Sequence, residues 1–288
     1  MIVVPGPAST ELGLRVAELL GTKVVPVESK TFPDGESYIR LMGDVGGENA
    51  VIVQATGPPQ DTHLIQLFLM IDAVRDLGVK DVVAVVPYFA YARQDKRFLP
   101  GEAFSVKTVM NLLRDCGVNR VITVNAHNPW VLKAFQVPVD DLSAISLLAE
   151  HFKNQGLDGA FSLSLGKKAL DMATQANRVL NGGFDYVATQ RDRITGKVTI
   201  EGRALPVKDR DVIIFDDIIS SGGTMALAVK AMRDQGARRV YAACVHPLLA
   251  KGAEEKILGS GAEGIVGTDC IPSPISLVSV APIIAQAL

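Results

Sequence analysis

Two adjacent carboxylates stand beside a run of small residues in the second half of the chain. Asp216 and Asp217 follow the apolar segment 212–215, and residues 220–224, Ser-Ser-Gly-Gly-Thr, come shortly after them. Carboxylates accept hydrogen bonds from sugar hydroxyls. Small residues let backbone N–H groups close around an anion, and the N-terminus of a following helix adds a partial positive charge. A sugar phosphate would satisfy both halves of this segment.

The order of features in this segment is more specific than a glycine-rich loop alone. It runs strand, two acids, small residues, helix, and ligands of open α/β sheets bind outside the carboxyl ends of the strands. The alternative is a metal-binding strand end followed by an ordinary capped helix. We predict a sugar-phosphate site made of Asp216, Asp217, Ser220, Ser221, Gly222, Gly223 and Thr224.

A second polar cluster, residues 93–97, follows the apolar segment 82–87. Its sequence is Arg-Gln-Asp-Lys-Arg, and the residues just before it include Tyr88 and Tyr91. Guanidinium groups bind phosphate oxygens bidentately and also stack on flat rings. Arg93 and Gln94 are therefore candidate nucleotide contacts. The alternative is a solvated basic turn.

A third candidate is the turn at residues 32–36, Phe-Pro-Asp-Gly-Glu. Phe32 could stack on an adenine ring, while the carboxylates of Asp34 and Glu36 could accept hydrogen bonds from its exocyclic amine. The alternative is an exposed Pro-Asp-Gly turn, which is a common turn sequence.

These candidates need a scaffold, and short segments rich in Val and Ile alternate with helical patterns along the chain. Most of these segments are apolar at nearly every residue, as in strands of a parallel sheet that are buried on both faces. We predict strands at 51–54, 81–87, 121–125, 211–215 and 239–245. We predict helices at 11–20, 63–77, 103–116, 143–153, 167–180, 224–235 and 250–258.

This alternation is typical of βαβ units. The predicted fold class is α/β, with two similar lobes that each hold a mostly parallel sheet flanked by helices. The lobes would span residues 1–141 and 142–276, with a soft boundary near 139–143. Residues 182–202 are rich in Gly, Thr and charge without a sustained apolar period. We expect them to form an exposed flap or hairpin.

Length and composition limit the function classes. A chain of 288 residues exceeds the size at which one core usually keeps growing, so two lobes are expected. The net charge of -2 and the absence of a long basic run disfavour nucleic-acid binding. Three distant cysteines suggest neither a metal site nor a disulfide framework, which favours a reducing cytoplasm. We expect no signal peptide, no membrane span and no membrane partner.

Several segments resemble a known family. Residues 212–224 resemble the ribose-5-phosphate loop of the type I phosphoribosyltransferase fold. Residues 32–36 and 88–98 resemble the adenine-binding loop and the ATP-contacting segment of ribose-phosphate pyrophosphokinases. The tail, residues 278–285, resembles that family's C-terminal helix, which packs back on the N-terminal lobe. The resemblance implies two phosphoribosyltransferase-type lobes, with a C-terminal helix at 277–288 on the first lobe.

The resemblance also implies an activity, namely transfer of the pyrophosphoryl group of ATP to the 1-hydroxyl of ribose 5-phosphate with Mg²⁺. Residues 216–224 would hold ribose 5-phosphate, and His127 would contact the metal. Arg191 and Arg193, on a closing flap, would be catalytic. ATP would be bound by Phe32, Asp34, Glu36, Arg93, Gln94 and Asp95. In the family the loop at 32–36 reaches a neighbouring subunit, which implies a homodimer or higher homo-oligomer with a shared ATP site.

Three positions depart from the family pattern. Arg191 stands where the flap carries Lys, Asn125 stands two residues before His127 where Asp is usual, and Ser164 aligns with a Mg²⁺-holding Asp of the pyrophosphate loop. Lys167 or Lys168 could contact phosphate instead. These changes support an alternative, a catalytically weakened paralogue that binds nucleotide and ribose phosphate and regulates an active partner. A third possibility is a phosphoribosyltransferase acting on a base, against which the ATP-contacting segments argue.

Overall fold

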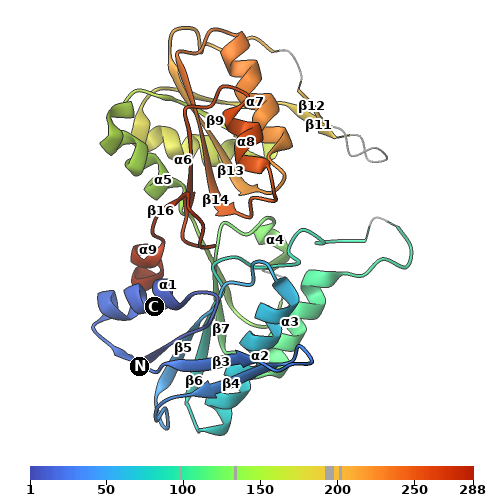
Figure 1. Ribbon diagram of the computed structural model, residues 1–288, viewed down its shortest axis with the longest axis vertical. Helices are drawn as coiled ribbons and strands as arrows, with labels where there is room; N and C mark the ends of the chain where they lie inside the picture. The colour runs from blue at the N-terminus through green and yellow to red at the C-terminus, as the bar shows by residue number, and fades with distance from the viewer. Residues whose placement is uncertain (98, 133–134, 192–197, 201–202) are drawn as a thin grey trace. The chain divides into compact units, whose positions relative to one another are not determined.

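The computed structural model describes residues 1–97, 99–132, 135–191, 198–200 and 203–288 (Figure 1). At 189–191 and 198 it describes the backbone alone. The chain divides into two compact units, Met1–Ser143 with Ser279–Leu288, and Ala144–Val278. Each unit contains a six-stranded sheet whose paired strands are parallel. The predicted α/β class with two similar lobes is confirmed.

The first unit is built around the strand order β2-β1-β5-β6-β7-β8. A separate antiparallel hairpin, β3–β4, lies outside this sheet. The bounds of its elements are β1 (Ile2–Pro5), α1 (Thr10–Leu20), β2 (Lys23–Val24), β3 (Val27–Thr31), β4 (Ser37–Leu41), β5 (Asn49–Val53), α2 (Gln60–Asp76), β6 (Asp81–Val85), α3 (Ser105–Asp115), β7 (Arg120–Val124), α4 (Pro129–Leu132), β8 (Val139–Leu142) and α9 (Ala281–Ala287).

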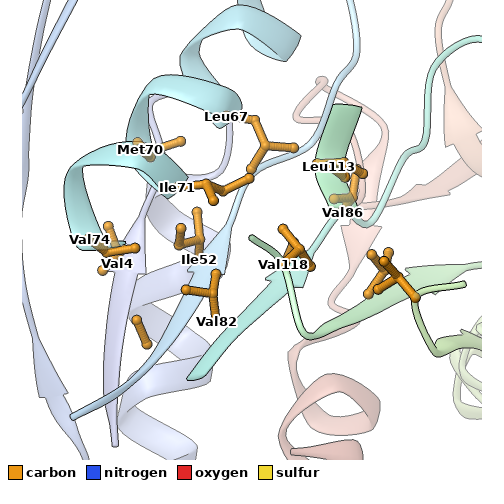
Figure 2. Packing of buried hydrophobic residues seen from close by; sticks show 14 of the residues in the cluster. Val4, Ile52, Leu67, Met70, Ile71, Val74, Val82, Val86, Leu113 and Val118 are labelled. Carbon is orange, nitrogen blue, oxygen red and sulfur yellow. The ribbon is translucent and has the colours of Figure 1, made fainter. Parts of the chain in front are cut away.

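Helices α2 and α3 supply the apolar side chains over one face of this sheet. Figure 2 shows Leu67, Ile71 and Val74 of α2 above Ile52 and Val82 of the strands, all of them buried. On another side, α1 packs against β1 and against the terminal helix α9. The central strands β1, β5, β6 and β7 are rich in Val and Ile because neither of their faces is exposed to water.

The second unit repeats the architecture with the strand order β10-β9-β13-β14-β15-β16. Helix α7 covers one face, and α5 and α6 pack on the sheet as well. Its elements are α5 (Ile145–Phe152), a π-helical turn (Lys153–Leu157), β9 (Phe161–Leu165), a 3₁₀ turn (Lys167–Ala169), α6 (Leu170–Leu180), β10 (Phe184–Val187), β11 (Thr189–Arg191), β12 (Val198–Ile200), β13 (Asp211–Ile219), α7 (Gly223–Asp234), β14 (Arg239–Pro247), α8 (Ala253–Leu258), β15 (Gly264–Thr268) and β16 (Ser276–Val278).

The two sheets share one topology. In each, the second strand in the chain lies outside the first, and the third lies on the first strand's other side. Strand order therefore reverses between β1 and β5 in the first unit and between β9 and β13 in the second. Ligands of open α/β sheets bind at such a switch point, outside the carboxyl ends of the strands.

Three predicted element boundaries are wrong. The predicted flap starts too early, because Phe184–Val187 is β10, an edge strand paired with β9. The predicted C-terminal helix also starts too early, because Ser276–Val278 is strand β16 and α9 begins at Ala281. Strand β13 continues beyond Phe215 to Ile219, because β14 pairs with it along that length. The seven predicted helices are all present within a few residues.

None of the helices in the described ranges is both long enough and apolar enough to cross a lipid bilayer.

Candidate active site

The switch point of the second unit brings acids and lysines to one edge of the sheet. Strands β9 and β13 are parallel neighbours, with Ser164 opposite Phe215. The residues that follow each of these positions therefore emerge at the same edge. On β9 they lead to Lys167 and Lys168, both exposed, and on β13 they are Asp216 and Asp217, both half-buried.

Asp216 and Asp217 lie within β13, not after it as predicted. Asp216 is opposite Cys244 of β14. Asp216 Oδ1 accepts the Asp217 N–H at 3.0 Å, and Asp217 Oδ1 accepts the Ile218 N–H at 2.9 Å. Burial raises the pKa of the Cys244 thiol, and the Asp216 carboxylate raises that pKa further. The two acids therefore present oxygen acceptors beside the strand that carries the buried thiol Cys244.

The start of α7 forms a cradle of backbone amides. Gly222 precedes the helix with a φ of 71°, and no side chain caps the N-terminus. Helix α7 has no acidic residue in its first turn. The first N–H groups of a helix have no partner within the helix, and they carry a partial positive charge. An anion bound here would satisfy these donors.

The two glycines of the cradle have different surroundings. A Cβ atom added to Gly222 would lie 2.8 Å from the Ala253 carbonyl oxygen, so the fold itself requires glycine. A Cβ atom added to Gly223 would meet nothing nearer than Ser221 Oγ at 3.9 Å. The space above Gly223 is therefore open, which leaves room for a ligand to approach the backbone.

Neighbouring segments hold the cradle in place. The Leu249 and Ala250 N–H groups donate to the Ile219 and Ser220 carbonyls, each at 3.0 Å. Lys256 Nζ donates to the Ser221 carbonyl at 3.1 Å. The loop between β13 and α7 is thus fixed by the segment that follows β14.

The equivalent switch point of the first unit is filled by Gln54. This side chain is fully buried, and its Oε1 accepts the Ala8 N–H at 3.0 Å. Its Nε2 lies 3.3 Å from the His63 carbonyl oxygen and 3.4 Å from Gln66 Oε1. A Cβ atom added to Gly6 would lie 2.2 Å from Gln54 Oε1. A buried glutamine held by these groups thus follows β5 at the switch point of the first unit.

The predicted nucleotide segment forms a turn after β6. The Gln94 N–H donates to the Tyr91 carbonyl at 3.2 Å, and Arg93 between them is exposed. Gln94 Nε2 lies 3.3 Å from the Lys96 carbonyl and 3.4 Å from the Ala103 carbonyl. Arg93 therefore extends outward, whereas the amide nitrogen of Gln94 is used within the loop.

The structure brings Asp95 and the His127 loop together. Asn128 Nδ2 donates to Asp95 Oδ2 at 2.5 Å, which ties the segment after β6 to the one after β7. His127 is exposed beside this bond. Asn125 has a left-handed φ of 41°, and its N–H donates to the Leu142 carbonyl at 2.8 Å. Asp95, predicted to contact ATP, and His127, predicted to contact the metal, thus lie at the same edge of the sheet.

Asp95 and His127 suit a divalent cation that is carried mainly by phosphate. No group of three or more His, Cys, Asp or Glu side chains that could hold a metal occurs among the residues the structure describes. Mg²⁺ is usually bound through one or two carboxylates plus substrate phosphates. The half-buried Asp95 carries a carboxylate of this kind.

The predicted adenine-binding turn is the tip of the β3–β4 hairpin. The Phe32 N–H donates to the Glu36 carbonyl at 2.8 Å, and Asp34 Oδ1 accepts the Glu36 N–H at 3.3 Å. Phe32 is 42% exposed and packs edge-to-face with Tyr38, with ring centroids 5.9 Å apart. Lys30 Nζ lies 4.3 Å from the Tyr38 ring centroid. In the described ranges, no hydrogen bond or ion pair joins this tip to Arg93, Gln94 or Asp95.

Two sequence interpretations of the catalytic loops change. Ser164 is not in a loop but inside β9, fully buried, and its hydroxyl has no hydrogen-bond partner among the described residues. The alignment of Ser164 with a metal-holding Asp is therefore wrong. Arg191 ends strand β11, opposite Val198 of β12, and its side chain is outside the described part. Arg193 lies outside the described residues altogether.

Sequence reasoning missed the residues that hold the nucleotide segment. Thr56 Oγ1 donates to the Tyr88 carbonyl at 2.9 Å and accepts the Ala90 N–H at 2.8 Å. Tyr91 Oη donates to Asp61 Oδ1. Asn128 follows the predicted His127 directly, so proximity in sequence could have suggested it. Thr56 and Asp61 come from another strand end and another helix, and no local pattern marks them.

Comparison with known proteins covers both units. Residues 1–117 match the sequence profile of the N-terminal domain of ribose phosphate pyrophosphokinase, and residues 145–258 match that of the phosphoribosyl transferase domain. A ribose-phosphate pyrophosphokinase of Saccharolobus solfataricus is 40% identical over 94% of this chain and 93% of its own length. One of Methanothermobacter thermautotrophicus is 41% identical over 98% and 97%.

A solved structure agrees with these relatives. The phosphoribosylpyrophosphate synthetase of Mycobacterium smegmatis has a TM-score of 0.87 at 27% identity and covers 99% of this chain and 96% of its own. Both profiles, the full-length relatives and this structure lead to one conclusion: the chain belongs to the ribose-phosphate pyrophosphokinase family.

Proposed function

We propose that this protein transfers the β,γ-pyrophosphoryl group of ATP to the 1-hydroxyl of ribose 5-phosphate. The products are phosphoribosyl pyrophosphate and AMP. The observation that carries the proposal is the uncapped amide cradle at the start of α7, directly after two carboxylates of β13, in a chain of this family. An anion-binding helix start beside hydroxyl-binding acids suits a sugar phosphate.

In the second unit, the cradle binds the 5-phosphate. The amides of Gly223 and Thr224 and the hydroxyls of Ser220, Ser221 and Thr224 surround it, with Gly222 setting the entry to the helix. The carboxylates of Asp216 and Asp217 accept hydrogen bonds from ribose hydroxyls. The exposed Lys167 and Lys168 lie at the carboxyl end of the neighbouring strand. They supply positive charge at this edge for phosphate oxygens.

In the first unit, Arg93 binds ATP phosphates, and Asp95 with His127 would hold Mg²⁺ together with those phosphates. Gln94 shapes this loop through its hydrogen bonds to Lys96 and Ala103. When bound, Mg²⁺ would supply positive charge that stabilises the negative charge of the transferring phosphates. The Phe32 ring stacks on adenine, and Asp34 and Glu36 accept hydrogen bonds from its amine.

Arg191 and Arg193 complete the proposal as flap residues that neutralise charge on the transferring phosphates. Arg191 keeps the charge that the family's Lys carries, but presents it as a planar fork with several donors. The β11–β12 hairpin provides the backbone for this flap.

We also propose a homodimer or higher homo-oligomer in which the hairpin tip at residues 32–36 completes the ATP site of a neighbouring subunit. The tip exposes Phe32 on a ribbon that stands outside the main sheet. A cytoplasmic location belongs to the same proposal, and the three free cysteines fit a reducing compartment.

The direct test is AMP release from ATP and ribose 5-phosphate in the presence of Mg²⁺, with phosphoribosyl pyrophosphate identified by mass spectrometry. We expect both products in equal amounts, and neither when ribose 5-phosphate is omitted. Binding of both substrates by calorimetry without turnover would contradict the catalytic proposal. It would instead favour the non-catalytic paralogue considered from the sequence.

A further inference from the structure

Tyr91 adopts a backbone conformation that aromatic residues rarely take. Its φ is +64°, in the left-handed region that glycine normally supplies. Such a conformation is strained for a residue with a Cβ atom, and it persists only where surrounding contacts fix it. Tyr91 lies two residues before Arg93, the predicted phosphate ligand.

Burial does not account for this conformation, because Tyr91 is 41% exposed. Its side chain is instead held by a hydrogen bond from Tyr91 Oη to Asp61 Oδ1. Asp61 lies in the first turn of α2, thirty positions earlier in the chain. The bond joins the nucleotide segment to the main helix that packs on the sheet. In the folded protein the Asp61 carboxylate raises the pKa of Tyr91.

Within the turn that begins at Tyr91, one side chain is buried and the next is exposed. The Gln94 N–H closes it on the Tyr91 carbonyl at 3.2 Å. Ala92, inside the turn, is 6% exposed and packs in the core, whereas Arg93 is exposed. A change at Tyr91 would alter the direction in which the chain leaves this residue. It would therefore alter where the Arg93 guanidinium lies.

Upstream of Tyr91 the segment is already fixed. Buried Thr56 binds both the Tyr88 carbonyl and the Ala90 N–H. Downstream, Asp95 is held by Asn128. The link between Tyr91 and Asp61 is thus the anchor at the start of the stretch that carries Arg93.

We propose that Asp61 and Tyr91 are positioning residues that hold Arg93 in place for the phosphates of ATP. This inference rests on the proposed function, since it assumes that Arg93 binds ATP. The two residues act through Arg93 and do not themselves touch the reacting atoms. Their loss should weaken ATP binding and leave ribose 5-phosphate binding unchanged.

The first test replaces Tyr91 by Phe, which keeps the ring and removes the donor. Because this variant loses a hydrogen bond to a charged group, we expect its KM for ATP to rise about tenfold. We expect the KM for ribose 5-phosphate to stay within about twofold of wild type, because its site is in the other unit. The matched control is Tyr241→Phe on β14, the same one-atom change away from the nucleotide segment, which should leave both constants unchanged.

The second test is a double-mutant cycle with Asp61. Asp61→Ala should raise the KM for ATP as much as Tyr91→Phe, and the double variant should be no worse than either single variant. Asp61→Asn keeps a carbonyl acceptor and should restore part of the ATP affinity. The control on the same helix is Asp72→Ala, also an exposed acid of α2.

Calorimetry with ATP distinguishes the possible failures. A wild-type protein that does not bind ATP would contradict the proposed function. Wild-type binding that Tyr91→Phe leaves unchanged would overturn only the positioning role. Additive effects in the cycle, or an equal loss of ribose 5-phosphate affinity, would also overturn it, since they indicate independent contributions or general destabilisation.

Discussion

Gly222 and Gly223 allow the phosphate cradle to be tested separately from the fold. The protein leaves the space above Gly223 open, with no atom nearer than 3.9 Å to an added Cβ. We therefore expect the free energy of unfolding of the Gly223→Ala protein to stay within about 1 kcal/mol of wild type, since alanine also favours the helix. The added methyl group should lower ribose 5-phosphate affinity at least about tenfold, because it occupies the approach to the amides. Calorimetric titration with ribose 5-phosphate measures this.

Gly222→Ala is the matched variant, one residue earlier. Its φ of 71° and its contact with the Ala253 carbonyl make alanine strained there. Unfolding in urea should show a loss of about 1–3 kcal/mol. A Gly223→Ala protein that binds the sugar phosphate as tightly as wild type would refute the cradle assignment.

Ser164 yields a prediction opposite to the one its sequence alignment suggests. An aspartate at a metal-binding loop position would aid Mg²⁺ binding, but Ser164 is fully buried in β9 with an unpaired hydroxyl. A carboxylate there would be buried without a partner, so Ser164→Asp should destabilise the protein by several kcal/mol, about 3–5. Ser164→Ala is the control and should be neutral or stabilising. Thermal unfolding of both variants decides the matter, and a stable, more active Ser164→Asp protein would restore the loop alignment.

Some of these residues could be proposed from the sequence, and others could not. The acids and glycines of the candidate phosphate loop could be proposed from the sequence, because they form one continuous segment. Gln54 and Tyr91 could not be predicted. The first lies buried at a switch point that only the folded sheet creates, and the second combines a left-handed φ with a hydrogen bond to Asp61 of another helix. The alternation of Phe and Leu with Ser at 161–165 was a period-two signal for a strand, which the family alignment obscured.

At the scale of elements, the amino end of β13 is held by ion pairs from two surface arginines to the buried carboxylate of Asp211, away from the ligand edge. Asp211 accepts hydrogen bonds from Arg238 Nε at 2.9 Å and from Arg239 Nε at 3.0 Å, and its side chain is 7% exposed. Hydrogen bonds from Arg239 first, and then from Arg238, hold the pKa of Asp211 well below its usual range. These contacts tie β13 to β14 and to the turn before it.

The lowered pKa predicts how stability depends on pH. The contribution of Asp211 is present in full above its ordinary pKa of about 4 and is lost as the pH falls toward the folded-state pKa. At neutral pH, Asp211→Asn should cost about 1–3 kcal/mol of unfolding free energy. The difference from wild type should shrink steadily below about pH 4. Urea unfolding at a series of pH values checks this, and a difference that does not change with pH would count against the ion pair.

The predicted strands are those with long apolar runs, namely β5, β6, β7, β13 and β14. Burial alone was not a sufficient signal, because β9 is buried but alternates Ser with Phe and Leu and was read as a loop. The hairpin β3–β4 was predicted only as a turn. Its strand Val27–Thr31 is mostly polar and exposed, and Ser37–Leu41 is only half-buried and interrupted by Arg40, so neither shows a long apolar run. Strand β10 was assigned to the flap for the same reason, because an edge strand with exposed residues lacks the apolar run.

At the scale of the whole molecule, two units of one topology have diverged in their switch points. In the second unit, two half-buried acids, two exposed lysines and the uncapped start of α7 follow β9 and β13 at this edge. In the first unit, the buried Gln54 follows β5 at the equivalent edge and accepts the Ala8 N–H. This difference explains why we assign the sugar phosphate to one unit only. In the first unit we therefore place the nucleotide on the segments that follow β6 and β7.

The assembly can be tested by mixing two inactive variants. Phe32→Ala removes the proposed adenine contact at the tip of β3–β4, and Arg93→Ala removes the proposed phosphate contact after β6. No hydrogen bond or ion pair joins these two sites within the described part of one chain, and Phe32 is 42% exposed. We expect each variant alone to have lost most of its activity.

Co-expression of the two variants distinguishes a shared site from one formed within a single chain. In a mixed dimer with shared sites, one site carries both lesions and the other carries none. Because about half of randomly assembled dimers are mixed, the pool should recover about a quarter of wild-type activity. If each ATP site were built within one chain, every site would carry one lesion and no activity would return. Recovery should also require contact between subunits, so it should disappear on dilution below the dissociation constant of the dimer and reappear on concentration.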